Sequence, residues 1–219
     1  RDKFTYICKL LDMGTKGCLN FLTVGMDGKS YLRREEAKFL VGVLGLNELV
    51  QIMTGEQLHE SENALKYGLE IMTYIYKSMQ THAEDAGITC LLEETPAEGF
   101  SLRAALLDLK HCPEAKNYVK GNIETGHVYY TNSIHLAYDA HVDIFTRITK
   151  QAKFAPIIQA GSIIHNWFGE HEPDPDALLN LYFSVLKNTA AVQTADSPDM
   201  TVCLSCHKMN KGLHTNCPN

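Results

Sequence analysis

The sequence has few of the features that mark a chain for nucleic acid or for a membrane. It contains no run of Lys or Arg, and its formal net charge is −6. Nucleic-acid-binding proteins usually present a basic stripe that neutralises phosphates, so composition argues against that class. No apolar stretch approaches the roughly 20 residues that span a bilayer, and no signal peptide opens the chain. We therefore expect no nucleic-acid partner and no membrane partner.

The sequence also lacks the cysteine pattern of a secreted protein. Its seven cysteines are an odd number, and four of them are scattered in apolar or loop contexts: Cys8, Cys18, Cys90 and Cys112. This distribution favours reduced thiols and one metal cluster over a disulfide framework. A cytoplasmic location is the expectation that follows.

The remaining cysteines lie in the final segment, CLSCHKMNKGLHTNCPN, residues 203–219. Cys203 and Cys206 form one Cys-x-x-Cys knuckle, and Cys217 with the following proline resembles the first half of a second. Zinc prefers four tetrahedral ligands, so three thiolates leave one corner for His207, His214 or water. Free thiols in a frayed tail are the alternative interpretation. Because a fourth cysteine is due at the next position, and the chain starts as if in mid-helix, we expect both ends to be cut.

Hydrophobic periodicity predicts alternating strands and helices. Apolar or β-prone runs predict strands at 38–45, 88–94, 127–132, 157–167 and 190–194. Helical spacing predicts helices within 61–87, 101–110, 133–151 and 173–187, the last with Asp174 as N-cap and Pro175 in its first turn. This order predicts a parallel sheet or barrel with helices outside. Five strands are too few for a closed barrel, so the alternatives are half of a barrel or an open doubly wound sheet.

The turn ETPAEG, residues 94–99, follows the second predicted strand. Ligands of parallel α/β proteins lie beyond the carboxyl ends of strands, and the free N–H groups of the next helix could hold a phosphate there. Glu94 and Glu98 would repel a phosphate unless one of them caps the helix or contacts a sugar hydroxyl. A well-capped turn without a ligand is the alternative interpretation.

The segment YYTNSIH, residues 129–135, follows the third predicted strand. Thr131, Asn132 and Ser133 are good helix caps, and capping is the commonest role of such residues. Because His135 and His165 have no partner at metal spacing, packing is the simpler role for each. Cys90 fits a small buried hydrophobe.

Five collinear stretches resemble the anaerobic (class III) ribonucleoside-triphosphate reductases, which are glycyl radical enzymes. These stretches are VGVLGLNELVQIMTG, LEETPAEGFSLRAALLD, YYTNSIHLAYDAH, AGSIIHNWFGE and the terminal cysteine knuckle, and they cover most of residues 38–217. The resemblance implies an α/β fold, a ten-stranded barrel made of two five-stranded parallel halves. This chain would be the second half, with residues 1–200 as partial barrel and residues 201–219 as a truncated zinc-ribbon-like segment.

The resemblance also implies a reaction, the reduction of ribonucleoside triphosphates to deoxyribonucleotides. In the family, a radical-SAM activating enzyme generates a glycyl radical, and a cysteine thiyl radical then takes hydrogen from the ribose 3′ carbon. The 2′ hydroxyl leaves as water, and a reductant, formate in many members, completes the reaction. The implied cofactors are structural zinc and the glycyl radical, and the implied partners are the substrate, the activating enzyme and a second copy of the chain.

The resemblance places the substrate's phosphates on the turn TPAEG, and it places three later residues at the same end. The expected substrate-binding residues are Thr95, Pro96, Ala97, Glu98, Gly99, Asn132, Ser133 and His135, and the expected zinc ligands are Cys203, Cys206 and Cys217. We expect the ATP-binding regulatory cone and the radical cysteine loop of the family to precede this segment and the radical glycine to follow it, so no catalytic residue is assigned and the chain alone is expected to be inert. The alternatives are a catalytically inactive zinc-containing scaffold and another glycyl radical enzyme such as a lyase, which the zinc knuckle and ETPAEG disfavour.

Overall fold

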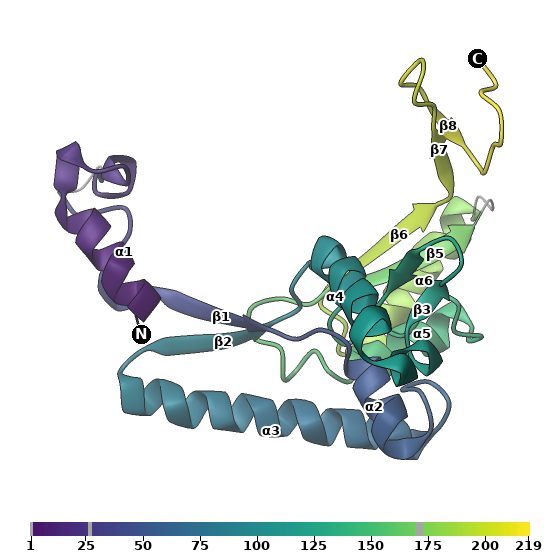
Figure 1. Ribbon diagram of the computed structural model, residues 1–219, viewed down its shortest axis with the longest axis horizontal. Helices are drawn as coiled ribbons and strands as arrows, with labels where there is room; N and C mark the ends of the chain where they lie inside the picture. Colours follow the sequence, from purple (N-terminus) through teal and green to yellow (C-terminus); the bar gives the residue numbers. More distant parts are fainter. Residues whose placement is uncertain (1, 26–27, 170–172) are drawn as a thin grey trace. The chain divides into compact units, whose positions relative to one another are not determined.

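The computed structural model describes residues 2–25, 28–169 and 173–219, and it divides into two compact units. The first unit comprises Arg1–Val41 and Tyr74–Leu91, and the second comprises Gly42–Thr73 and Leu92–Asn219. Its regular elements have the colours and labels of Figure 1. In the described part of the chain, no helix is both long enough and apolar enough to cross a membrane.

The first unit contains helix α1 and a two-stranded sheet. Its elements are α1 (Asp2–Asp12), three 3₁₀ turns (Gly14–Lys16, Asn20–Leu22, Arg34–Glu36), β1 (Lys38–Gly42), β2 (Thr89–Glu93) and the second half of α3 (Glu62–Ala86). Strands β1 and β2 lie side by side (Figure 1). The Arg34 guanidinium pairs with the Asp12 carboxylate, and the Phe4 and Phe39 rings meet edge to face at 5.4 Å.

Local sequence explains the limits of α3. The Ser61 hydroxyl accepts a hydrogen bond from the Ala64 N–H at 3.1 Å, as an N-cap does. At the other end, Gly87 adopts a left-handed φ of +63°, and the Ile88 N–H returns to the Ala83 carbonyl at 3.0 Å. The predicted helix over 61–87 is therefore confirmed.

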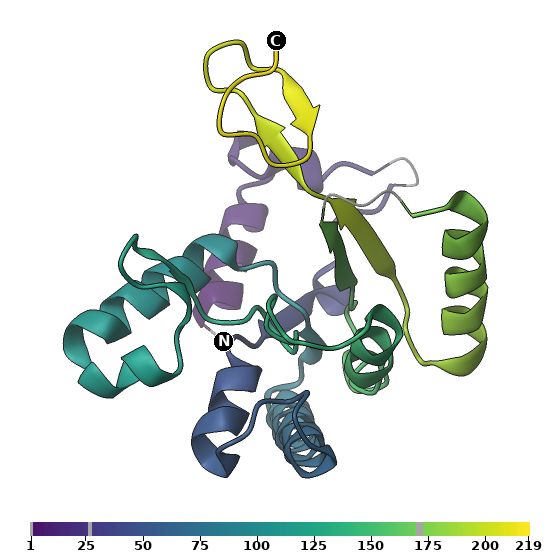
Figure 2. The ribbon, with the colours of Figure 1, turned by 90° about the vertical axis from the view of Figure 1, so that its right-hand side faces the viewer.

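The second unit holds the remaining helices and three sheets. Its elements are α2 (Leu46–Thr54), α4 (Glu98–His111), a 3₁₀ turn (Pro113–Asn117), β3 (Lys120–Asn122), β4 (His127–Tyr129), α5 (Ile144–Ala152), β5 (Ile164–Gly169), α6 (Pro175–Asn188), β6 (Thr194–Pro198), β7 (Met200–Val202) and β8 (Met209–Lys211). Strands β5 and β6 are parallel, whereas β3–β4 and β7–β8 are antiparallel hairpins. Figure 2 shows the β7–β8 hairpin following β6 toward the C-terminus.

Two apolar clusters pack these elements together. Ile148 and Ala152 of α5 meet Ile164 of β5 and Val185 of α6. Ala105 of α4 packs with three further buried residues: Ala115, Val119 and Val128. One cluster thus joins α5, β5 and α6, and the other joins α4 to β4; the cavity described below is lined by α4, β5 and the chain at and after β4.

The sequence predicts the mixed α/β character and most of the elements. Strand β2 and helices α4 and α6 lie where predicted, and the Asp174 carboxylate caps α6 by accepting from Asp176 and Ala177 N–H groups at 3.0 Å. One five-stranded parallel sheet is not seen in the described residues, which form four two-stranded sheets. The strand predicted at 157–167 begins only at Ile164, and the one predicted at 190–194 begins at Thr194.

Two predictions around residue 130 are wrong in detail. The strand expected at 127–132 ends at Tyr129 and pairs antiparallel with β3 rather than joining a parallel sheet. The helix expected over 133–151 begins only at Ile144. Ser133 has a left-handed φ of +48°, which no helix tolerates, and Asp143 supplies the N-cap by accepting from the Thr146 N–H at 2.9 Å.

Candidate functional site

Three segments of the second unit line one open cavity of about 420 Å³. They are the first turn of α4, the chain after β4, and β5. The lining residues are Glu98, Ser101, Tyr129, Tyr130, Thr131, Asn132, His135, Leu136, Tyr138, His165 and Trp167. Of the eight predicted substrate-binding residues, Glu98, Asn132 and His135 are among these. Thr95, Pro96, Ala97, Gly99 and Ser133 lie outside the lining.

Hydrogen bonds from the start of α2 hold the segment after β4 in place. The Glu48 carboxylate, only 3% exposed as a residue, accepts hydrogen bonds from the Thr131 N–H at 3.1 Å and the Thr131 hydroxyl at 2.7 Å. The Gly45 N–H donates to the Thr131 carbonyl at 2.9 Å. Burial raises the pKa of Glu48, and the Thr131 hydroxyl opposes this shift. The motif GLNE therefore fixes the cavity wall rather than lining the cavity.

Helix α4 also forms hydrogen bonds with this segment. The Ser101 hydroxyl donates to the Tyr130 carbonyl, and the Tyr130 hydroxyl donates to the Asp108 carboxylate at 2.8 Å. Burial and the neighbouring Asp108 raise the pKa of Tyr130, so its phenol stays neutral and remains a donor.

Asn132 and Ser133 do not act as caps. Among the described residues, neither the Asn132 Oδ1 nor the Ser133 hydroxyl has a hydrogen-bond partner, although both atoms are buried. Ser133 also carries the left-handed φ of +48°. Unsatisfied buried groups and strained backbone are rare and gather at functional segments, so they mark 132–133 as more than a structural turn.

His135 is tied to the loop that precedes β5. Its Nε2 lies 3.0 Å from the Ile163 carbonyl oxygen and 3.3 Å from the Glu94 Oε2. The Glu94 Oε2 also accepts the Ile163 N–H at 2.8 Å. The Glu94 side chain is 4% exposed and the His135 side chain 12%, so this pair is largely shielded from water. The packing role predicted for His135 misses this carboxylate–imidazole contact.

A row of rings continues from His135 along the cavity. The His135 and His165 rings meet edge to face at 5.7 Å, and His165 stacks on Trp167 at 6.0 Å. The Tyr138 ring meets the Trp167 ring edge to face at 5.2 Å. Burial, reinforced by the nearby His135, lowers the pKa of His165 and favours its neutral form.

The turn 94–99 makes close contact with the end of β1. A Cβ on Gly42 would lie 1.6 Å from the Thr95 Oγ1, so the chain at Thr95 approaches the backbone as only glycine permits. Helix α4 starts after Ala97 with no side-chain cap on its first turn. Its leading N–H groups thus lack the side-chain cap that the alternative interpretation of this turn expects, and they are available to an anion or to water.

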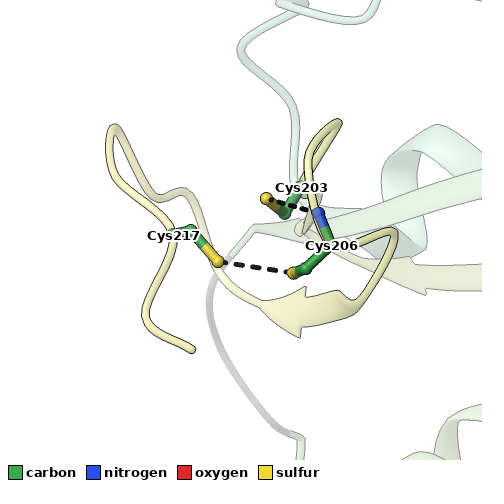
Figure 3. A group of neighbouring side chains, drawn as sticks. All are labelled: Cys203, Cys206 and Cys217. Atoms are coloured by element: carbon green, nitrogen blue, oxygen red, sulfur yellow. Dashed lines mark hydrogen bonds between the residues drawn. The ribbon is translucent and has the colours of Figure 1, made fainter.

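The three C-terminal cysteines lie together on and beside the β7–β8 hairpin (Figure 3). Their sulfurs lie within 4.8 Å of one another, and the Cys206 and Cys217 sulfurs are 3.6 Å apart. Zinc–sulfur bonds of ~2.3 Å in a tetrahedron require sulfur separations of ~3.8 Å, so this donor set fits zinc. The N–H groups of Cys206 and Ser205 lower the pKa of Cys203 to about 7, which favours the thiolate that metals need.

The two histidines considered for the fourth zinc position differ in their surroundings. The His214 Nε2 lies 2.7 Å from the Lys211 carbonyl, so it is a hydrogen-bond donor there. His207 adopts a left-handed φ of +57° directly after Cys206, and its N–H donates to the Cys203 carbonyl at 2.8 Å. This hydrogen bond closes the Cys203–Cys206 knuckle, and His207 lies in the turn that the knuckle forms.

Sequence reasoning missed most of the aromatic lining. Tyr129, Tyr138 and Trp167 were not selected, because they resemble ordinary core residues. One signal was available: His165 and Trp167 are two apart on a predicted strand and therefore share a face.

Comparison with known proteins identifies the family. The family model for anaerobic ribonucleoside-triphosphate reductase matches residues 4–219. The chain is similar to the anaerobic ribonucleoside-triphosphate reductase of Salmonella typhimurium, with 24% identity over 71% of this chain and 21% of that protein. It is also similar to that of Enterobacteria phage T4, with 28% identity over 56% of this chain and 18% of that protein.

Solved structures share the fold. The anaerobic ribonucleotide reductase of Thermotoga maritima in complex with dATP and CTP superposes with a TM-score of 0.69, at 17% identity, over 93% of this chain and 31% of that chain. The same enzyme with glycerol in the active site gives a TM-score of 0.66 over 93% of this chain and 30% of that one. The chain thus spans about a fifth of the curated relatives' length. It belongs to the anaerobic ribonucleoside-triphosphate reductase family.

Proposed function

We propose that the chain is part of an enzyme that reduces ribonucleoside triphosphates to deoxyribonucleotides without oxygen. The family match over residues 4–219 carries this proposal. Because the chain spans only 21% of the Salmonella relative, the activity belongs to a longer polypeptide. A glycyl radical would supply the hydrogen-abstracting thiyl radical there. A radical-SAM activating enzyme and a second copy of the chain are the proposed protein partners, and the proposed location is the cytoplasm.

We further propose that residues 1–200 form part of the second five-stranded half of the barrel, and that residues 201–219 form a zinc-ribbon-like segment. The TM-score of 0.69 to a solved family member over 93% of the chain supports this assignment. Cys203, Cys206 and Cys217 would hold structural zinc, which the mutual distances of their sulfurs allow.

The cavity is the proposed substrate site. The uncapped start of α4 would take the triphosphate through its N–H groups, with Thr95, Pro96, Ala97 and Gly99 shaping that turn. The Glu94 carboxylate is engaged by the Ile163 N–H and by His135, so Glu98 is the remaining carboxylate of this turn that would repel a phosphate. The aromatic lining would hold the nucleoside by stacking.

Asn132, Ser133 and His135 are proposed to contact the sugar end of the substrate. Asn132 and His135 line the cavity. Because the Asn132 Oδ1 has no hydrogen-bond partner among the described residues, this side chain can rearrange toward a ligand without losing a hydrogen bond at that oxygen. Ser133 lies outside the lining, so its proposed role depends on the same rearrangement.

Trp167 offers a direct test, because it is the only tryptophan in the chain and it lines the cavity. Excitation of tryptophan fluorescence during titration with CTP or ATP should give a saturable change. Cytidine, which lacks the phosphates, should bind more weakly by at least tenfold if α4 holds the triphosphate. Identical responses to the nucleotides and to inorganic triphosphate would contradict a nucleoside site.

The activity itself is tested in the complete polypeptide that carries this chain. Under anaerobic conditions, with its activating enzyme and formate, it should release deoxyribonucleotides from ribonucleoside triphosphates. Absence of product when the glycyl radical is present by electron paramagnetic resonance would overturn the proposed function.

A further inference from the structure

The hydrogen bonds of His135 fix the position of one ring proton. The Ile163 carbonyl, 3.0 Å from the Nε2, can only accept a hydrogen bond, so the Nε2 must carry hydrogen. The Glu94 carboxylate, 3.3 Å from the same nitrogen, is an acceptor as well. Nδ1 is therefore the ring nitrogen whose proton can come and go, on a residue that lines the cavity.

The surroundings of the pair shield it from water and fix its geometry. The Glu94 side chain is 4% exposed, and its Oε2 is held by the Ile163 N–H at 2.8 Å. Among the described residues, the Glu94 carboxylate lies within ion-pair distance of His135. A shielded carboxylate that faces the Nε2 holds the tautomer and the orientation of the ring, the arrangement of an acid–base pair.

The other titratable groups near the pair leave this role to His135. His165 packs against the ring at 5.7 Å, and its lowered pKa means that it does not add a second positive charge. Glu98 lines the cavity and is exposed. Tyr129 and Tyr138 also line it, and burial raises the pKa of Tyr129.

We propose that Glu94 and His135 form a proton-transfer pair in which His135 protonates the leaving hydroxyl of the substrate ribose and Glu94 is its positioning residue. This inference rests on the proposed function, because the loss of the 2′ hydroxyl as water needs a proton at the 2′ oxygen. The observations behind it are that His135 lines the cavity and that Glu94 holds the Nε2 side of its ring.

The step balances within the substrate and the ring. Once C3′ has lost its hydrogen atom, the imidazolium gives its Nδ1 proton to the 2′ oxygen. The C2′–O bond breaks, and its electron pair leaves with the water. The 3′ hydroxyl returns its proton to Nδ1 as the C3′ carbonyl forms, so the imidazolium is restored and the unpaired electron is left on C2′.

His135→Gln is the decisive variant, because a glutamine amide can still donate to Ile163 and Glu94 but cannot carry a proton. A general acid contributes ~10²–10⁴-fold, so kcat of the complete enzyme should fall by about that factor while CTP affinity, measured by equilibrium dialysis, changes less than about threefold. His127→Gln, at an exposed position on β4, is the matched control and should keep full activity. Wild-type kcat in His135→Gln would overturn the proposal.

Glu94→Gln tests the positioning residue. Its kcat should fall at least about tenfold while its KM for CTP changes less than about threefold, because the His135 ring loses the carboxylate that holds it and the rest of the cavity lining is unchanged. An unchanged kcat, or a rise in KM alone, overturns the proposal even if His135→Gln fails to fold. If the wild-type enzyme yields no deoxyribonucleotide, the proposed function itself fails, whereas an active wild type with an equally active His135→Gln variant refutes this pair alone.

Discussion

The Glu48 carboxylate and Thr131 are joined by two hydrogen bonds, from the Thr131 N–H at 3.1 Å and from its hydroxyl at 2.7 Å. The contact links the first turn of α2 to the cavity wall across a long stretch of sequence. Burial raises the pKa of Glu48, because the charged form loses more solvation than the two bonds return. The carboxyl that positions the wall is therefore also a source of pH-dependent stability.

The sign of that dependence can be predicted. A carboxyl with a raised folded pKa contributes stability that is fully present below its unfolded value of ~4.3 and is lost as pH rises through the folded value. Glu48→Gln mimics the protonated form, so its free energy of unfolding should gain on wild type as pH rises above ~4.3 and level off once the folded Glu48 is ionised. Urea unfolding across this range is the measurement, with the exposed Glu124→Gln as control. Parallel curves for wild type and Glu48→Gln would refute the raised pKa.

The close approach of β1 to the turn 94–99 gives a second prediction. In Gly42→Ala, the added Cβ would meet the Thr95 Oγ1 at 1.6 Å and its Cβ at 2.5 Å, so rotation of the threonine cannot relieve the contact. We expect a loss of ~1–3 kcal/mol in the free energy of unfolding, as overpacking usually costs.

Gly99→Ala is the matched control for Gly42→Ala. Nothing lies within 4 Å of a Cβ at Gly99, which occupies the first turn of α4. This variant should be stabilised by ~0.5–1 kcal/mol, because alanine suits a helix better than glycine. Thermal unfolding of the two variants should therefore shift in opposite directions, and equal shifts would contradict the contact at Thr95.

The sequence predicts those parts of the fold that local physics dictates. Helix α3 is long and strongly periodic, and helix α6 carries its own cap at Asp174. The error over 133–151 has a non-local cause, because backbone carbonyls of the segment before α5 are satisfied by Arg147 rather than by a helix. Asp143 before an apolar run was the available start signal for α5, and the longer apolar spacing obscured it.

The candidate site was predictable by chain segment but not by side chain. The rule that ligands lie after strands selected the turns that contribute Glu98, Asn132 and His135 to the cavity. The pairing of Glu94 with His135 joins residues 41 apart, and no local pattern encodes such a contact. The proximity of the three C-terminal cysteines is confirmed, because ligand spacing is itself a local pattern, and zinc remains a prediction.

Arg147 provides a third prediction. It is 7% exposed, and its guanidinium donates to four main-chain carbonyls at 3.0–3.4 Å: those of Leu136, Ala137, Tyr138 and Ala140. Arg147→Met should cost ~2–4 kcal/mol of unfolding free energy, because buried carbonyls lose a charged donor. Arg147→Lys should recover only part, since a lysine cannot form the same planar fork.

The control for Arg147 is Arg103→Lys at an exposed position on α4, which should unfold like wild type. Tryptophan fluorescence gives a second measurement, because the Arg147 guanidinium lies 6.0 Å from the Trp167 ring. Arg147→Met should change the emission, whereas Arg103→Lys should leave it unchanged. An Arg147→Met variant as stable as wild type would show that water replaces the guanidinium at no cost.

The three clustered cysteines give the last prediction. Each sulfur is within 4.8 Å of the other two, so each should be needed for tight zinc binding. Cys203→Ser, Cys206→Ser and Cys217→Ser should each weaken zinc binding at least ~10-fold, because serine is a poor ligand for zinc. The exposed Cys112 lies at the end of α4, and Cys112→Ser should bind zinc like wild type. Competition with a colorimetric chelator measures all four variants. Equal retention of zinc in the three cluster variants and in Cys112→Ser would mean that the metal sits elsewhere or binds nonspecifically, and the cluster would then be three free thiols.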